Sequence, residues 1–187
     1  ETEFSVVRNE MESGENNPYM SLWQRMTSAA FDWHNYGKST IGARTDVENV
    51  KIENLQNFYR KYYQPDNAVL LVAGKFDTAA TLNLIQQVFG AIPKPSRMLS
   101  PTYTQDPAQD GGREVNVRRT GDTQLTAVLY HTAAGSHKDS AAMAALSEVL
   151  GSTPNGRLHQ NMVEKKLAVN VNPWNFELAE RGYVVFM

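Results

Sequence analysis

Cysteine is absent from the 187 residues of this sequence. The chain therefore forms no disulfide and no thiolate metal site, so any zinc would have to be bound by His, Asp or Glu side chains. Because cysteine-free chains occur in every compartment, this absence leaves the localisation open.

Long apolar runs and an excess of one charge are absent as well. The longest apolar stretch, residues 68–73, is far shorter than the ~20 residues that cross a bilayer, and it predicts a buried strand. Lys and Arg number 18 against 20 Asp and Glu, without a basic stripe interleaved with aromatic residues. This balance is typical of a globular protein and disfavours a nucleic-acid partner or a membrane span.

The two ends of the sequence lack the features of a complete chain. Residue 1 is Glu, residues 1–8 have neither the basic nor the apolar region of a signal peptide, and the apolar run 182–187 stops without a polar tail. We therefore expect an internal piece of a longer protein.

A helix with two acidic residues on its apolar side is expected at the start. Phe4, Val7 and Met11 recur at helical spacing. Glu3 and Glu10 lie seven residues apart, which puts them about 20° apart around a helix and about 10 Å apart along it. We expect both carboxylates to face inward, one able to bind a metal ion and the other to support it. Ion pairs with Arg or Lys from another element are an equally open interpretation.

The remainder of the first half alternates helices with irregular segments. In chain order we expect a turn at residues 13–18, a helix capped by Asn17 with Pro18 in its first turn, a loop at 33–45, an amphipathic helix at 47–62, the strand at 68–73 and a helix from Asp77 to Gly90.

A proline-rich segment without apolar periodicity, residues 93–112, predicts a linker between two units. Beyond it we expect strands at 115–117 and 124–131, helices at 140–151 and 157–166, and strands at 167–171 and 182–187. Runs of strands beside runs of helices favour the α+β class, here a two-layer sandwich of mainly antiparallel sheet packed by helices.

The four histidines do not form a metal motif by themselves. His34, His131, His137 and His159 include no pair at the i, i+4 spacing that directs two imidazoles to one ion. Without further information, solvated polar side chains are the favoured interpretation of all four. No nucleophile elbow, P-loop or dinucleotide-binding fingerprint is present.

Several short motifs in a fixed order resemble the pitrilysin/insulinase family of inverted-zincin metallopeptidases. They cover nearly the whole chain, and the order is more specific than any one of them. After the acids at 3 and 10 they are residues 15–18 (ENNP), 34–37 (HNYG), 41–42 (IG), 63–74 (YQPDNAVLLVAG), 89–93 (FGAIP), 156–158 (GRL) and 163–168 (VEKKLA).

The resemblance implies a zinc-dependent endopeptidase in which an H-x-x-E-H helix supplies two histidine ligands and a water-activating glutamate. That motif is absent from these residues. By position, Glu10 matches the family's distal zinc ligand, and Glu3 matches an additional upstream acid that supports the site. Zinc is therefore expected in the full-length protein, whereas residues 1–187 alone are expected to be inactive and metal-free.

The resemblance also implies a domain arrangement and partners. Residues 1–95 would end a first peptidase-type domain, 96–113 would be the linker, and 114–187 would begin a second, homologous domain that binds no metal. A homologous half or subunit would close a chamber around a peptide substrate. A bacterial periplasmic or envelope location is favoured, although mitochondrial and cytosolic members leave it open.

The alternative is a non-catalytic scaffold or partner subunit of the same family. A simple α+β binding module with glutamate salt bridges is a third hypothesis.

Overall fold

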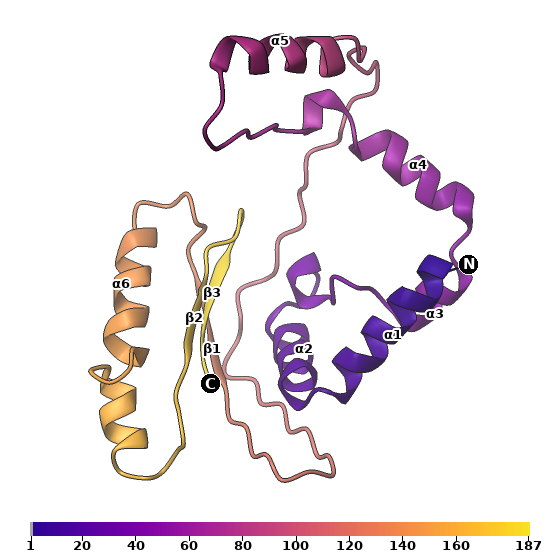
Figure 1. Ribbon diagram of the computed structural model, residues 1–187. Helices are drawn as coiled ribbons and strands as arrows, with labels where there is room; N and C mark the ends of the chain where they lie inside the picture. Colours follow the sequence, from indigo (N-terminus) through magenta and orange to yellow (C-terminus); the bar gives the residue numbers. More distant parts are fainter. Residues whose placement is uncertain (1) are drawn as a thin grey trace. The chain divides into compact units, whose positions relative to one another are not determined.

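A computed structural model describes residues 2–187, and the chain divides into two compact units (Figure 1). Unit 1 comprises the chain up to Gly42 together with Thr104–Met187, and unit 2 comprises Ala43–Tyr103. This division differs from the expected boundaries at 95 and 113, which stay a prediction about a longer protein.

Unit 1 contains a three-stranded antiparallel sheet. Its strands are β1 (Val128–Thr132), β2 (Pro173–Phe176) and β3 (Gly182–Phe186), in the spatial order β1-β3-β2. The last strand in the sequence is therefore the central one, and its backbone is hydrogen-bonded on both sides. Val185 lies opposite Leu129 on β1 and Trp174 on β2, and its side chain is fully buried.

Two helices of unit 1 lie on opposite faces of this sheet, α2 (Pro18–Ala30) and α6 (Ser140–Gly151) (Figure 1). Side chains alternate between the faces of a strand, so Tyr183 and Val185 point to the same face. There they form the core with Phe31, which directly follows α2. Partly buried side chains that pack around this core are Trp23, Met26, Ala30, Tyr36, Ala127, Leu129, Phe176, Leu178 and Met187.

The start of α2 follows the sequence prediction closely. The side chain of Asn17 accepts hydrogen bonds from the amides of Tyr19 and Met20, at 2.9 and 3.3 Å, and Pro18 occupies the first turn. The preceding helix, α1 (Thr2–Asn16), extends further than predicted, so residues 13–16 are helical rather than a turn. Intrahelical bonds of α1 therefore continue through Gly14 despite its low helix propensity.

On the other face of the sheet, α6 approaches β2 closely. A Cβ atom at Gly151 would lie 2.6 Å from Cβ of Pro173, so glycine is the residue that permits this contact. The predicted helix at 157–166 is present in part as the short π-helical segment η3 (His159–Val163).

Unit 2 consists of helices joined by extended segments. They are α3 (Arg44–Asn49), α4 (Ile52–Tyr62), the 3₁₀ turn η2 (Pro65–Asn67) and α5 (Thr78–Phe89). The single helix expected at 47–62 is divided because Val50 has an extended backbone, with φ −64° and ψ 131°. The capping prediction for α5 is confirmed: Oδ1 of Asp77 accepts a hydrogen bond from the Ala80 amide at 2.7 Å.

Three predicted strands are wrong in the described chain. Residues 68–73, 115–117 and 167–171 are not strands, and β2 begins where no strand was expected. A strand requires a neighbouring strand for its backbone hydrogen bonds, and these segments pair with none in residues 2–187. The α+β class with an antiparallel sheet is confirmed. No helix among the described residues is both long and apolar enough to cross a membrane.

The central position of Val185 leads to a stability prediction. Val185→Ala should lower the free energy of unfolding of unit 1 by about 2 kcal/mol, because it removes buried methyl groups and leaves a cavity. Urea denaturation followed by the fluorescence of Trp23 and Trp174, which contact each other across the core, measures this change. Val169→Ala is the matched control, since Val169 is 94% exposed. Equal destabilisation by the two substitutions would contradict this account of the core.

Candidate functional site

Both acidic residues singled out in the sequence lie on α1, and both are exposed. Met11 is buried, with 6% of its surface accessible, whereas Val6, on the side of the helix where the acids project, is 54% exposed. The prediction that Glu3 and Glu10 face a protein interior is therefore wrong within residues 2–187. The physical reason is that no described element of unit 1 covers this side of α1, so both carboxylates are exposed.

The alternative of a salt bridge is not observed either. Within the described part of the chain, the side chains of Glu3 and Glu10 form no ion pair or hydrogen bond. No group of three or more His, Asp or Glu side chains among these residues could hold a metal ion. A catalytic zinc site uses three protein ligands, so Glu10 by itself is not a complete site. Its carboxylate is on a regular helix and is free of competing partners.

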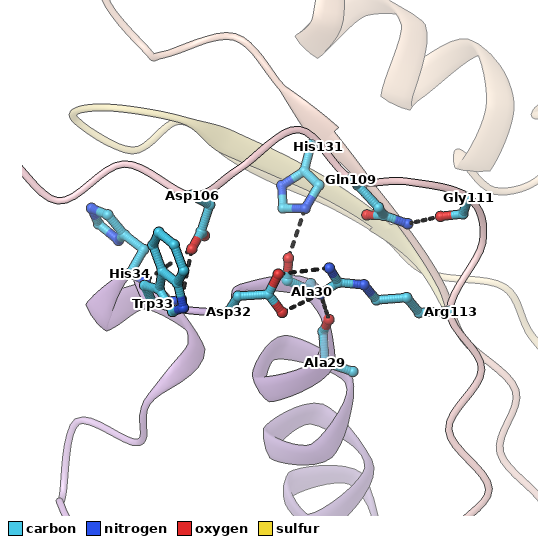
Figure 2. Close-up of polar contacts among 10 residues, drawn as sticks. All are labelled: Ala29, Ala30, Asp32, Trp33, His34, Asp106, Gln109, Gly111, Arg113 and His131. Carbon is cyan, nitrogen blue, oxygen red and sulfur yellow. Dashed lines mark hydrogen bonds and ion pairs between the residues drawn. The ribbon is translucent and has the colours of Figure 1, made fainter.

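A second group of polar residues, which the sequence did not indicate, surrounds the C-terminal end of α2 (Figure 2). Nη1 of Arg113 donates a hydrogen bond to the carbonyl of Ala29 at 2.6 Å, and Nε2 of His131 donates one to the carbonyl of Ala30 at 2.9 Å. The last carbonyls of a helix have no intrahelical partner. Arg113 and His131 satisfy two of them, and the positive guanidinium also suits the negative end of the helix dipole.

Arg113 is held in place by a two-point ion pair. Its Nη1 and Nη2 atoms donate to Oδ1 and Oδ2 of Asp32 at 2.6 and 2.7 Å. These hydrogen bonds lower the pKa of the Asp32 carboxyl, an effect that outweighs the opposing effect of desolvation. The pair thereby connects the residues after α2 to the segment that precedes β1.

The loop after α2 is fixed by the segment expected to be a linker. Oδ1 of Asp106 accepts hydrogen bonds from the backbone amides of Trp33 and His34, at 2.7 and 3.1 Å (Figure 2). The loop then forms the 3₁₀ turn η1 (Asn35–Gly37). A Cβ atom at Gly37 would lie 2.8 Å from the carbonyl oxygen of Phe31, so the turn can pack this closely only with glycine.

The interpretation that all four histidines are solvated is wrong for His34 and His131. The His34 side chain is 13% exposed and its Nε2 lies 2.8 Å from Oε2 of Glu180. The His131 ring packs edge-to-face on Phe31 at 4.8 Å between centroids, and its Nδ1 is buried without a hydrogen-bond partner among the described residues. Glu180 lies 146 residues from His34 in the sequence. Ala30 and Phe31 lie 101 and 100 residues from His131, so local spacing could not reveal these contacts.

The polar group around α2 is structural in character. Its side chains bind backbone groups and one another, and Asp106 Oδ2 is a further buried oxygen without a partner in the described chain. Neither Glu3 nor Glu10 belongs to this group.

Comparison with known proteins identifies the family. Residues 49–187 match the family model described as the Peptidase M16 inactive domain. The chain belongs to the M16 peptidase family. The resemblance to pitrilysin/insulinase metallopeptidases is thus confirmed.

Individual M16 proteins resemble the chain over most of its length. The zinc protease PqqE of Helicobacter pylori is 31% identical over 92% of this chain and 40% of its own. The crystal structure of a protease from Helicobacter pylori superimposes with a TM-score of 0.89 at 30% identity, covering 99% of this chain and 46% of that one. A probable mitochondrial-processing peptidase subunit beta of Arabidopsis thaliana is 24% identical over 80% of this chain and 28% of its own. The chain thus spans less than half of each of these M16 proteins.

The ion pair beside α2 makes stability depend on pH. The folded-state pKa of Asp32 is lowered, so the contribution of its charged form is complete above the unfolded value, about 3.9, and is lost as the pH falls through the lower folded value. Asp32→Asn should therefore destabilise the protein near pH 6, and its difference from wild type should shrink at acid pH. Urea unfolding from pH 2 to 7 measures this difference. The control is the exposed Asp122: Asp122→Asn should show no such trend, and a pH-independent effect of Asp32→Asn would refute the assignment.

Proposed function

We propose that this chain is part of a zinc-dependent endopeptidase that hydrolyses peptides or unstructured polypeptides, and that Glu10 is its distal zinc ligand. The single observation that carries the proposal is the free, exposed carboxylate on α1 of a chain in the M16 family. The two histidine ligands and the water-activating glutamate would come from an H-x-x-E-H helix outside residues 1–187. When bound, zinc polarises the scissile carbonyl and lowers the pKa of its water to about 7.

Glu3 has a supporting role in this proposal. It lies two helical turns before Glu10 on the same side of α1, too far away for both carboxylates to bind one ion directly. Its charge and hydrogen-bonding capacity would orient the groups that surround the metal ligands.

The rest of the proposal concerns the longer protein. Residues 1–95 would end the metal-binding domain and 114–187 would begin a homologous domain that binds no metal, joined by 96–113. A homologous half or subunit would complete a chamber for the peptide. The bacterial periplasm or cell envelope is the compartment that we propose, on the basis of the resemblance and the absence of cysteine.

A second candidate is a non-catalytic scaffold or partner subunit of the same family. Two observations favour it: the matching family model is described as an inactive domain, and the Arabidopsis relative is named as a subunit. The two candidates differ in the upstream sequence, where a catalytic protein carries an intact H-x-x-E-H helix and a scaffold carries a degenerate one.

Substitution of the proposed ligand tests the peptidase function. In the full-length protein, Glu10→Gln should abolish stoichiometric zinc and reduce kcat/KM for an unstructured peptide by more than 100-fold, because a neutral amide is a poor zinc ligand. Glu3→Gln should have a smaller effect, about 10–100-fold, as is typical of a supporting residue. Metal content by mass spectrometry and cleavage of a fluorogenic peptide give the two readouts.

The control for both substitutions is Glu12→Gln, on the same helix but towards its opposite side. It should retain zinc and activity. Full zinc content and activity in Glu10→Gln would contradict the ligand assignment, and a wild-type protein without zinc or hydrolysis would favour the scaffold.

The 187-residue chain provides a separate test. We expect it neither to cleave the peptide nor to bind zinc in competition with a micromolar chelator, because a single carboxylate supplies one of the three protein ligands that a catalytic site needs. Competition titration with a chromogenic chelator measures the affinity. Tight stoichiometric binding by this chain would show that its own residues form a complete site.

A further inference from the structure

The helix that carries Glu10 is joined to α2 by a single non-helical residue. α1 ends at Asn16 and α2 begins at Pro18, and Asn17 between them has φ −84° and ψ 119°. Among the residues of α1 whose burial the structure describes, only Met11 is buried. The direction of α1 relative to α2 therefore depends on few contacts.

A change in that direction would move Glu10. Its backbone lies seven residues before Asn17, which is about 10 Å along a helix, so a rotation of about 5° at Asn17 displaces it by about 1 Å. Binding sites require side chains that are held within about 0.5 Å of their productive positions. A metal ligand at position 10 consequently requires a contact that fixes the two helices relative to each other.

Arg119 makes such a contact. Its Nη1 donates hydrogen bonds to the carbonyl of Glu15, at 2.5 Å, and to Oγ of Ser21, and that Oγ donates to the same carbonyl at 3.1 Å. Glu15 lies in the last turn of α1 and Ser21 in the first turn of α2. The guanidinium thus joins the two helices across Asn17.

The charge of Arg119 suits this position. The last carbonyls of a helix lack intrahelical partners and form the negative end of its dipole. α1 has no basic residue in its last turn, and Arg119 is 104 residues from Glu15 in the sequence. The neighbouring Arg118 is also exposed, but its side chain forms no hydrogen bond or ion pair within the described residues. The contact therefore depends on position 119 rather than on a generally basic segment.

We propose that Arg119 is a positioning residue for Glu10. By binding the end of α1 and the start of α2, it holds the Glu10 carboxylate in the place where zinc is bound. This inference rests on the proposed role of Glu10 as the distal ligand. In this role Arg119 touches neither the metal nor the substrate, so its loss should weaken zinc binding and lower kcat while KM changes little.

Substitutions of two adjacent arginines in the full-length protein test the proposal. Arg119→Met keeps the length of the side chain but removes its donors and charge. It should weaken zinc affinity and lower kcat, each about 10-fold, as is typical of residues that orient metal ligands. Arg119→Lys should recover part of both, because an ammonium group is still a positively charged donor. The control Arg118→Met loses the same charge without losing a contact and should behave as wild type. Competition with a chelator measures zinc affinity, and the fluorogenic peptide gives kcat and KM.

A distance measurement separates positioning from a general effect on stability. The 187-residue chain has no cysteine, so spin labels can be attached at Asn9→Cys on α1 and Ser28→Cys on α2, both exposed positions. Pulsed electron paramagnetic resonance should give one narrow distance distribution, which Arg119→Met broadens or shifts and Arg118→Met leaves unchanged. Ser21→Ala removes the hydroxyl from the contact and should cause a smaller change of the same kind. It provides a second variant if Arg119→Met does not fold.

The outcomes distinguish this inference from the proposed function. Wild-type zinc affinity and kcat in Arg119→Met, or an unchanged distance distribution in both Arg119→Met and Ser21→Ala, would overturn the positioning role and leave the assignment of Glu10 intact. An equal loss of zinc in Arg118→Met would also reject it, because the effect would then follow the charge of the segment. A wild-type full-length protein without zinc overturns the proposed function, and this inference with it.

Discussion

The backbone groups of an extended segment must find hydrogen-bond partners on both edges, and this requirement explains the difference between the two units. β3 has neighbours on both sides, and its residues Gly182–Val185 are all buried. Residues 68–73 are more apolar than β3, yet they have no neighbour in the described chain and are exposed. Apolar composition alone therefore does not bury a strand, because leaving backbone groups unpaired in an apolar environment costs more than exposure to water.

A similar requirement shapes the end of α2. Its last carbonyls lie under the segment that leads into β1, where water is partly excluded, and they are satisfied by Arg113 and His131. Asp106 does the same for the amides of the following loop. The proline-rich segment is therefore more than a spacer in unit 1. Asp106 replaces the hydrogen bonds that solvent would otherwise make to the loop, and Arg113, which directly follows the segment, does so for the helix end.

The features that could be predicted from the sequence depend on residues that are close together in the sequence. Asn17 and Asp77 were identified as helix caps because a cap needs only the next three residues, and α6 was identified from its apolar spacing and its glycine. The roles of His34 and His131 could not be predicted, because their partners are determined by the fold and lie about 100 or more residues away. The strand prediction at 68–73 is wrong in the described chain, because pairing depends on a second segment that local patterns do not specify.

The exposure of Glu10 can be understood from the same energetics. A carboxylate buried without a partner would destabilise α1 by several kcal/mol or become protonated. In the described chain the Glu10 side chain is exposed, while α1 buries Met11 on another side of the helix. A ligand that is already held on a folded helix loses little conformational freedom when an ion binds. Desolvation of Glu10 would then occur only as histidine ligands and zinc arrive together, when the charge of the ion compensates for the lost hydration. On this argument, an exposed carboxylate in the 187-residue chain is consistent with the proposed zinc ligand, whereas a salt bridge at this position would have had to be broken first.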